Sequence, residues 1–352
     1  MQQKTSIIIT VTTAILLAVV FYLSGKPKQA FPPLGTEKIP ANEKQAIARS
    51  IELLRQPAPS NNHSSTAGTK VLPPKIHGCA TGDFQVIANL RPELNTTLLQ
   101  PGVVYPLWAR FSSNHSSLDD TQAAVQTLSI KLFDVPGEKY FGEENTHDLI
   151  FRSHSVFPYS DAASYAEAIA AFANGQPLKY FFNPLSPKIT AFRIHKASHQ
   201  QHLHLLGIDW WSALPYRYGR DHAVKYALRP CSLSSVKEYS SEAKLGKDFL
   251  RDTLIKSLRA GPACFDFLVQ FQTSPDLTPI EDPSVPWDET IAPFEPIARV
   301  NFPAQTVEPN GTSQCESREI HPWRAVPEHR PLGGINRLLR EIYPAVVGIK
   351  DL

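Results

Sequence analysis

The chain has 352 residues, of which 42% are hydrophobic, so it can bury one large core or two smaller ones. Its 35 basic and 33 acidic side chains leave a formal net charge of +2. This balance, with no basic stripe interleaved with aromatic residues, argues against a nucleic-acid-binding protein.

The N-terminus carries the first predicted element. Residues 6–24 contain no charged side chain and come close to the ~20 residues that cross a bilayer as a helix. A cleaved secretory signal is the alternative, but Tyr-Leu-Ser-Gly at 22–25 is a poor cleavage site. We therefore predict a membrane anchor over residues 1–28, or a secreted or periplasmic protein if the segment is removed. The flanking lysines leave the side of the membrane open.

A short helix and a polar linker are predicted over residues 29–69. Asn42 and Gln45 resemble a capping pair, and apolar residues follow at helical spacing: Ile47, Ile51 and Leu54. Residues 57–68 are rich in Pro and Ser, which is typical of a flexible connection. The folded body is expected over residues 70–352.

Within the body, strands and helices are mixed. Alternating hydrophobic residues predict strands at 83–88, 128–133, 265–271 and from 297 onward. Helices are predicted at 161–175, 244–261 and 334–343, the first two ending at glycine. Many strands interrupted by a helical block predict an α+β fold, an antiparallel β-barrel with helices packed outside it.

Cysteine and histidine spacing gives weaker indications. Cys79, Cys231, Cys264 and Cys315 form no CxxC pair, so buried free thiols are favoured over one or two disulfide bridges. Three histidines, with a fourth nearby, stand at apparent helical spacing: His195, His199 and His202, with His204. Because no further ligand is evident, a solvated or lipid-proximal helix face is favoured over a zinc site.

Two further patterns point to an anion site and a metal ligand. In ARFSS, residues 109–113, Arg110 and Ser112 are two apart and so lie on one face of a strand, an arrangement suited to an anion; a surface arginine beside a serine is the alternative. Tyr343 lies near the chain end. A tyrosinate can bind ferric haem iron when a cation stands nearby, although most helical tyrosines only pack.

From residue 70 to the C-terminus, the sequence resembles the catalase superfamily, specifically its short catalase-like branch. The segments that carry the resemblance, in chain order, are KIHGCATGDF, YPLWARFSS, LSIKLFDVPGEK, ALPYRYG, AVKYALRPC, GPACFDFLVQFQTSP, PIEDPSVPWDE and PWRAVPEHRPLGGINR. The resemblance implies a catalase-type barrel, a ferric haem of the b type and peroxide chemistry. It implies that Tyr343 is the axial iron ligand, that Arg110 lies near a haem propionate and that Ser112 orients a distal histidine. Arg337 and Arg340 are the expected cations beside the tyrosinate.

The sequence departs from the family pattern at several pocket positions. The distal histidine falls at Pro73, while His77 matches a second histidine further along the motif. The distal asparagine falls at Ser153, and the arginine one turn before the tyrosine falls at Leu339, with Arg340 nearest. Pro344 is expected to disturb helical geometry at Tyr343. The candidate catalytic residues are therefore His77, Ser112 and Ser153, in a pocket altered enough to predict weak catalase activity.

Three functions remain open from the sequence. The first is a haem-dependent peroxidase or catalase-like oxidoreductase acting on hydrogen peroxide or on organic and lipid hydroperoxides. The second is a haem-binding protein with little turnover, and the third is a pseudoenzyme scaffold. The expected partners are a small peroxide and a membrane, without nucleic acid, and a homo-oligomer is compatible with each.

Overall fold

The computed structural model describes residues 32–56, 75–114, 119–140, 142, 145–231, 245–307 and 318–347. The chain divides into two compact units, 1–33 and 34–352, and nearly all described residues belong to the second. The anchor predicted over 1–28, and also Pro73, lie outside the described residues. In the described part, no helix has the length and apolar character needed to span a bilayer.

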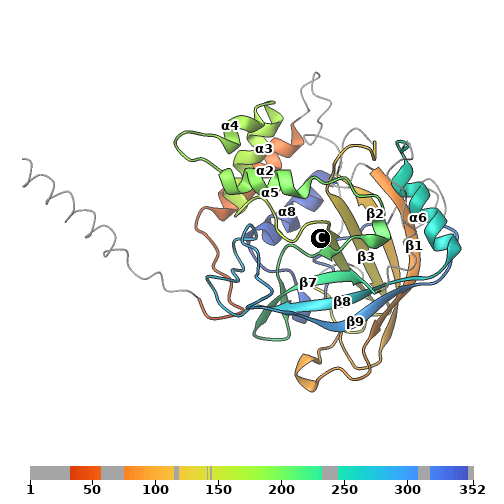
Figure 1. The fold of residues 1–352 in the computed structure, drawn as a ribbon. Helices are drawn as coiled ribbons and strands as arrows, with labels where there is room; N and C mark the ends of the chain where they lie inside the picture. Colours follow the sequence, from red (N-terminus) through yellow and green to blue (C-terminus); the bar gives the residue numbers. More distant parts are fainter. Residues whose placement is uncertain are drawn as a thin grey trace, which may run out of the picture. The chain divides into compact units, whose positions relative to one another are not determined.

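Eight antiparallel strands of the described chain close into a barrel, as predicted (Figure 1). They are β1 (Lys75–Val86), β2 (Val104–Ser113), β3 (Gln126–Phe133), β4 (Thr146–Arg152), β5 (Trp210–Trp211), β7 (His222–Pro230), β8 (Ala263–Phe271) and β9 (Phe294–Phe302). The order around the ring is β5-β4-β3-β2-β1-β9-β8-β7, and a pairing between β5 and β7 closes it. A further strand, β6 (Tyr216–Tyr218), forms a hairpin with β7.

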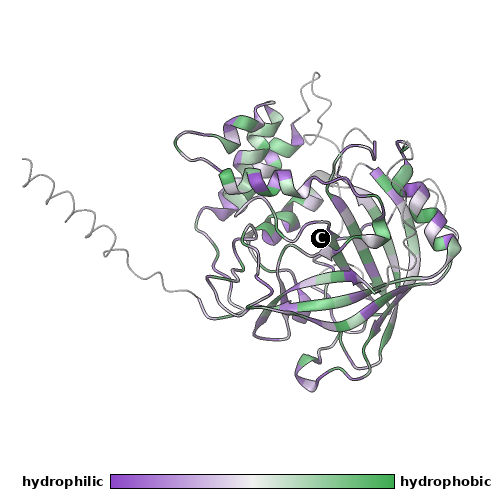
Figure 2. Ribbon diagram, in the orientation of Figure 1, coloured by the Kyte–Doolittle hydropathy of each residue, from purple (hydrophilic) through white to green (hydrophobic). Residues whose placement is uncertain are grey.

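Large aromatic side chains fill the barrel interior. Because neighbouring residues of a strand point to opposite faces, the strands alternate between apolar and polar positions, which Figure 2 shows as alternating colours. Phe267 of β8 contacts Phe84 of β1 and Phe151 of β4, with ring centroids 5.0 and 6.2 Å apart. Burial of Phe265, Phe267 and Val269 confirms the inward face predicted for that strand.

Helices pack outside the barrel at two places. The α-helices are α2 (Glu43–Arg55), α3 (Ala162–Ala173), α4 (Pro177–Phe181), α5 (Ile189–Ser198), α6 (Phe249–Ala260) and α8 (Gly334–Val347); short 3₁₀ turns are η1 (Pro92–Leu94), η2 (Leu205–Gly207) and η4 (Pro327–His329). α6 runs beside β1 (Figure 1). α2 packs on α3 and α8 through a separate apolar cluster that includes Leu54 and Leu338. α2, which was predicted to precede the folded body, therefore packs against that body.

Local details correct several of the predictions. Asn42 stands at the start of α2 but makes no capping hydrogen bond with its side chain. α6 begins at Phe249, after Gly246, because glycine disfavours a helix interior. α8 continues through Pro344 to Val347, so the expected break at Tyr343 is wrong. Proline removes one hydrogen bond of the last turn, but the packing of α8 upstream keeps the helix regular.

The cysteine and histidine expectations also change. Cys231 and Cys264 form a disulfide between neighbouring strand ends, with Cα atoms 5.6 Å apart, and Cys79 is also disulfide-bonded. Free thiols were therefore the wrong expectation for the described cysteines. α5 ends before His199, so the three histidines do not share a helix. Among the described residues, no cluster of His, Cys, Asp or Glu could hold a metal ion.

Candidate functional site

The outer face of β2, β3 and β4 brings the first candidate residues together. Arg110 and Ser112 share one side of β2, opposite Ala109 and Phe111, which belong to the core. In the paired strands, Arg110 lies opposite Ser129 of β3. Ser112 lies opposite Thr127 of β3, which in turn lies opposite Arg152 of β4. Arg110 and Ser112 are 2% and 0% exposed, so the alternative of a surface arginine is wrong.

Tyr343 on α8 lies within electrostatic reach of this face. Burial raises the pKa of its phenol, while the guanidinium groups of Arg110 and Arg152 act to lower it. The ring of His321 contacts the ring of Tyr343 edge-on, with centroids 4.6 Å apart. Burial and the nearby Arg324 lower the pKa of His321 to about 3, so it adds no charge at neutral pH. The cations that lower the pKa of the phenol are therefore Arg110 and Arg152.

Arg152 was missed by sequence reasoning. It is the last residue of β4 and is directly opposite Thr127, which in turn is opposite Ser112. Its guanidinium also lies 5.1 Å from the ring centroid of Phe157. The only signal that could have found it is this register, which cannot be read before the strands are paired.

The two arginines of α8 proposed as cofactor residues have other neighbours. Arg337 makes charge-assisted hydrogen bonds to three glutamates, including Glu43 of α2 at 2.7 Å and Glu281 at 2.8 Å. Arg340 lies over the rings of Tyr140 and Trp323, about 5 Å from each centroid. Neither arginine is among the groups that shift the pKa of Tyr343.

His77 occupies a bulge in β1. The pairing with β2 shifts between Ile76 and Gly78, so His77 falls outside the regular alternation of the strand. Its Nε2 lies 3.2 Å from Oε1 of Gln126, and its Nδ1 lies 3.7 Å from the carboxylate of Asp120. Burial and, next, the charge of Lys75 lower the pKa of His77 to about 3. The imidazole is therefore neutral at physiological pH and faces groups of its own chain on both sides.

Gln126 joins this histidine to Ser153. The backbone N–H of Gln126 donates to Oγ of Ser153 at 3.0 Å, and the backbone N–H of Ser153 donates to the carbonyl of Gln126 at 3.0 Å. Ser112 instead donates its hydroxyl hydrogen to the carbonyl of Thr127 at 3.3 Å. His77, Gln126 and Ser153 thus form one hydrogen-bonded network, at the place where β1 and β3 begin and β4 ends. Nothing in the sequence singled out Gln126, because its role depends on strand pairing.

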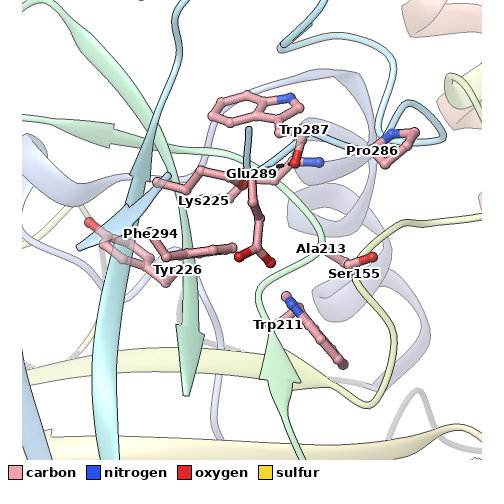
Figure 3. Close-up of a pocket in the computed structure, with 10 residues that line it drawn as sticks. Ser155, Trp211, Ala213, Lys225, Tyr226, Pro286, Trp287, Glu289 and Phe294 are labelled. Carbon is pink, nitrogen blue, oxygen red and sulfur yellow. Dashed lines mark hydrogen bonds between the residues drawn. The ribbon is translucent and has the colours of Figure 1, made fainter. Parts of the chain in front are cut away.

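A separate cavity of about 110 Å³ lies beside β7 (Figure 3). Its lining includes Lys225, Tyr226, Trp287, Phe294 and Trp211. Nζ of Lys225 is buried, has no hydrogen-bond partner among the described residues, and lies 5.1 Å from the ring centroid of Trp287. Burial lowers the pKa of this amine to about 7.

Solved structures with the same architecture are catalases. A bacterial catalase superposes with a TM-score of 0.60 over 92% of this chain and 63% of its own, at 16% identity. The described body has the catalase fold. Catalase A from Saccharomyces cerevisiae gives a TM-score of 0.59 at 13% identity, covering 92% of this chain and 67% of the yeast one. A fungal catalase gives 0.56 at 13% identity, covering 90% and 64%.

The chain is thus shorter than these catalases and spans about two thirds of their length. No protein-family model matches the sequence, and no curated protein does. The predicted resemblance is confirmed at the level of the fold.

Proposed function

We propose that the chain binds a ferric haem through Tyr343 and acts on hydroperoxides. The observation that carries this proposal is the placement of two guanidinium groups beside a half-buried phenol in a catalase fold. A tyrosinate ligand is favoured by nearby positive charge, and Arg110 and Arg152 lower the pKa of the phenol against the larger, raising effect of burial. A bound haem would contribute the redox chemistry that cleaves the peroxide bond.

The residues present suit such a group on the tyrosine side. Arg110 is 2% exposed and donates from one guanidinium nitrogen to the carbonyl of Arg318 at 3.0 Å. A buried guanidinium is stabilised best by an anion, and a propionate carboxylate would provide one. We infer that Arg110 binds a propionate and that Arg152 stabilises the phenolate of Tyr343. Arg337 instead holds α2 against α8.

On the distal side, His77 is the candidate base among the described residues, and it is a poor one. Proline at position 73 has no proton to give or take. An imidazole with a pKa of about 3 is a poor general base at neutral pH, because the best base has a pKa near the working pH. We infer that His77 positions Gln126 and Ser153 and does not itself move the peroxide proton. Hydrogen peroxide would therefore turn over slowly, while organic and lipid hydroperoxides remain candidate substrates.

Oxygen evolution from hydrogen peroxide tests this assignment. A general acid–base residue contributes ~10²–10⁴-fold, so the wild type should be slow and Pro73→His should accelerate it. His77→Ala should change the rate little beyond its effect on folding, which thermal unfolding measures in parallel. A fast wild type whose activity disappears in His77→Ala would show that the base has moved to residue 77.

A haem-binding protein without turnover is the second candidate. It is favoured by the enclosed position of His77, whose ring nitrogens both face groups of the chain. Turnover of cumene hydroperoxide with a reducing co-substrate separates the two functions, since only the first predicts a rate above that of free haemin.

We further propose that the body lies on the oxidising side of a membrane, held by the anchor predicted over residues 1–28. Disulfides persist mainly in oxidising compartments, and the described cysteines are disulfide-bonded.

A further inference from the structure

A compact apolar projection lies on the helical part of the body. Four large hydrophobic side chains are exposed within twelve residues: Leu178 (63%), Phe182 (46%), Leu185 (95%) and Ile189 (38%). They belong to α4, the start of α5 and the loop between these helices, which extends away from the barrel strands in Figure 1. Exposed apolar residues scattered singly are ordinary, but such a cluster marks a contact surface.

The projection is held in place by its own contacts. Tyr180 and Phe181 are buried beneath it, and the ring of Phe182 contacts that of Phe192, with centroids 4.9 Å apart. Asn183 closes the turn, since its side chain accepts from the N–H of Leu185 at 3.0 Å. The backbone N–H of Lys188 then donates to the carbonyl of Phe181 at 2.8 Å. Leu185 is therefore presented to solvent by a built turn.

The charged residues in the sequence segment that holds the projection are all basic. No Asp or Glu occurs between residues 168 and 208, whereas four basic residues do: Lys179, Lys188, Arg193 and Lys196. Three of the four are exposed; only Lys188 is half-buried and lies 3.6 Å from Glu167. Exposed apolar side chains with exposed cations close to them in sequence suit the interface of an anionic bilayer. There, apolar side chains enter the acyl boundary and cations meet the headgroups.

We propose that residues 178–189 form a membrane-docking surface that inserts Leu178, Phe182, Leu185 and Ile189 into an anionic lipid bilayer, with Lys179, Arg193 and Lys196 at the headgroups. The surface would set which face of the folded body meets the bilayer, independently of haem binding and of the predicted anchor. The body would thereby be brought to the membrane where lipid hydroperoxides arise.

Photolabelling of the full chain tests the proposal. The chain is mixed with vesicles of phosphatidylcholine and phosphatidylserine that carry a diazirine in the acyl chain, and tryptic peptides are then quantified. Peptide 180–188 carries Phe182 and Leu185, while peptide 260–299 carries Leu277, which is 53% exposed. Label per peptide should be several-fold higher in 180–188 and should fall in vesicles without phosphatidylserine.

Two matched variants sharpen the result. Leu185→Asn should lower the label in 180–188 about tenfold, because one leucine loses its burial in lipid. Leu277→Asn should leave it unchanged. The proposal is overturned if the chain stays in the supernatant, or if it sediments with 180–188 labelled no more than 260–299; the latter outcome would leave the anchor proposal intact. An unchanged label in Leu185→Asn would also overturn it.

Discussion

The half-buried Tyr343 and the buried Lys225 show how differently neighbouring groups act on a titratable side chain. Burial disfavours the charged form of both the Tyr343 phenol and the Lys225 amine. Tyr343 has Arg110 and Arg152 nearby, which favour its phenolate. Among the described residues, the ring of Trp287 and the charge of Asp282 favour the ammonium form of Lys225. The pKa of Tyr343 stays above its ordinary value because burial outweighs the two arginines, whereas the buried charge of Lys225 costs stability.

Replacement of Lys225 by methionine should therefore stabilise the protein near pH 7. The folded amine releases its proton near pH 7, but the unfolded chain keeps it up to the ordinary pKa of 10.5. Unfolding takes up a proton between these values, so stability rises with pH across this window, and the penalty is full below pH 7. We expect Lys225→Met to gain about 1–3 kcal/mol at pH 7 in urea unfolding.

Lys44→Met, on the exposed side of α2, is the matched control and should change the free energy of unfolding little. The gain in Lys225→Met should shrink toward pH 10. A destabilised Lys225→Met would mean that the amine has a favourable partner.

Sequence reasoning reached only part of the residue-scale site. Side chains two residues apart on a strand point to the same face, so the sequence alone could place Arg110 and Ser112 together. Arg152 and Gln126 could not be found, because their roles come from register between strands distant in sequence. Arg337 was predicted to be a basic neighbour that could stabilise the phenolate, but in the structure its guanidinium lies among Glu37, Glu43 and Glu281.

At the scale of elements, Arg337 fastens α8 to other segments of the chain. Its guanidinium is largely buried and lies among three carboxylates, from Glu37, from Glu43 of α2 and from Glu281. Glu37 and Glu43 are close in sequence, whereas Glu281 comes from a distant part of the chain, and the three carboxylates would repel one another without Arg337. The apolar contact between α2 and α8 is thus supplemented by one shared cation.

Replacement of Arg337 by methionine should destabilise the protein by about 2–4 kcal/mol, because breaking a buried ion pair leaves unpaired charge. Arg299→Met is the control. Its partner Asp266 and Arg299 itself are exposed, so its loss should cost less than about 1 kcal/mol. Chemical denaturation measures both. If Arg337→Met keeps its stability yet fails to bind haem, its role is at the cofactor after all.

Periodicity predicted the elements better than their ends. The sequence predicted both α3 and the point where it begins. The side chain of Asp161 accepts a hydrogen bond from the N–H of Ser164 at 2.7 Å and so caps the helix. The bulge at His77 and the continuation of α8 through Pro344 were not found. Both depend on packing between elements, which overrides a local preference.

At the scale of the whole molecule, ring closure and the Cys231–Cys264 disulfide constrain the same strands. The disulfide links the end of β7 to β8, whose strands already pair through the barrel. A bridge between residues 33 apart restricts the unfolded chain and contributes about 3–4 kcal/mol in the entropic view.

The compartment proposal makes a direct chemical prediction. Protein taken from its native membrane and denatured in iodoacetamide without reductant should show Cys231 and Cys264 unmodified. Both should be alkylated after reduction with dithiothreitol. Full alkylation before reduction would place the body in a reducing compartment and contradict the proposed location.

The absorption spectrum of the purified chain, reconstituted with haemin, tests the central claim most directly. Wild-type protein should bind one haem and show the charge-transfer band of a ferric tyrosinate complex. Tyr343→Phe should lose this band. Tyr165→Phe, which alters a partly buried tyrosine of α3, should keep it. Absence of a Soret band in the folded wild type, or a tyrosinate band that persists in Tyr343→Phe, would contradict the assignment.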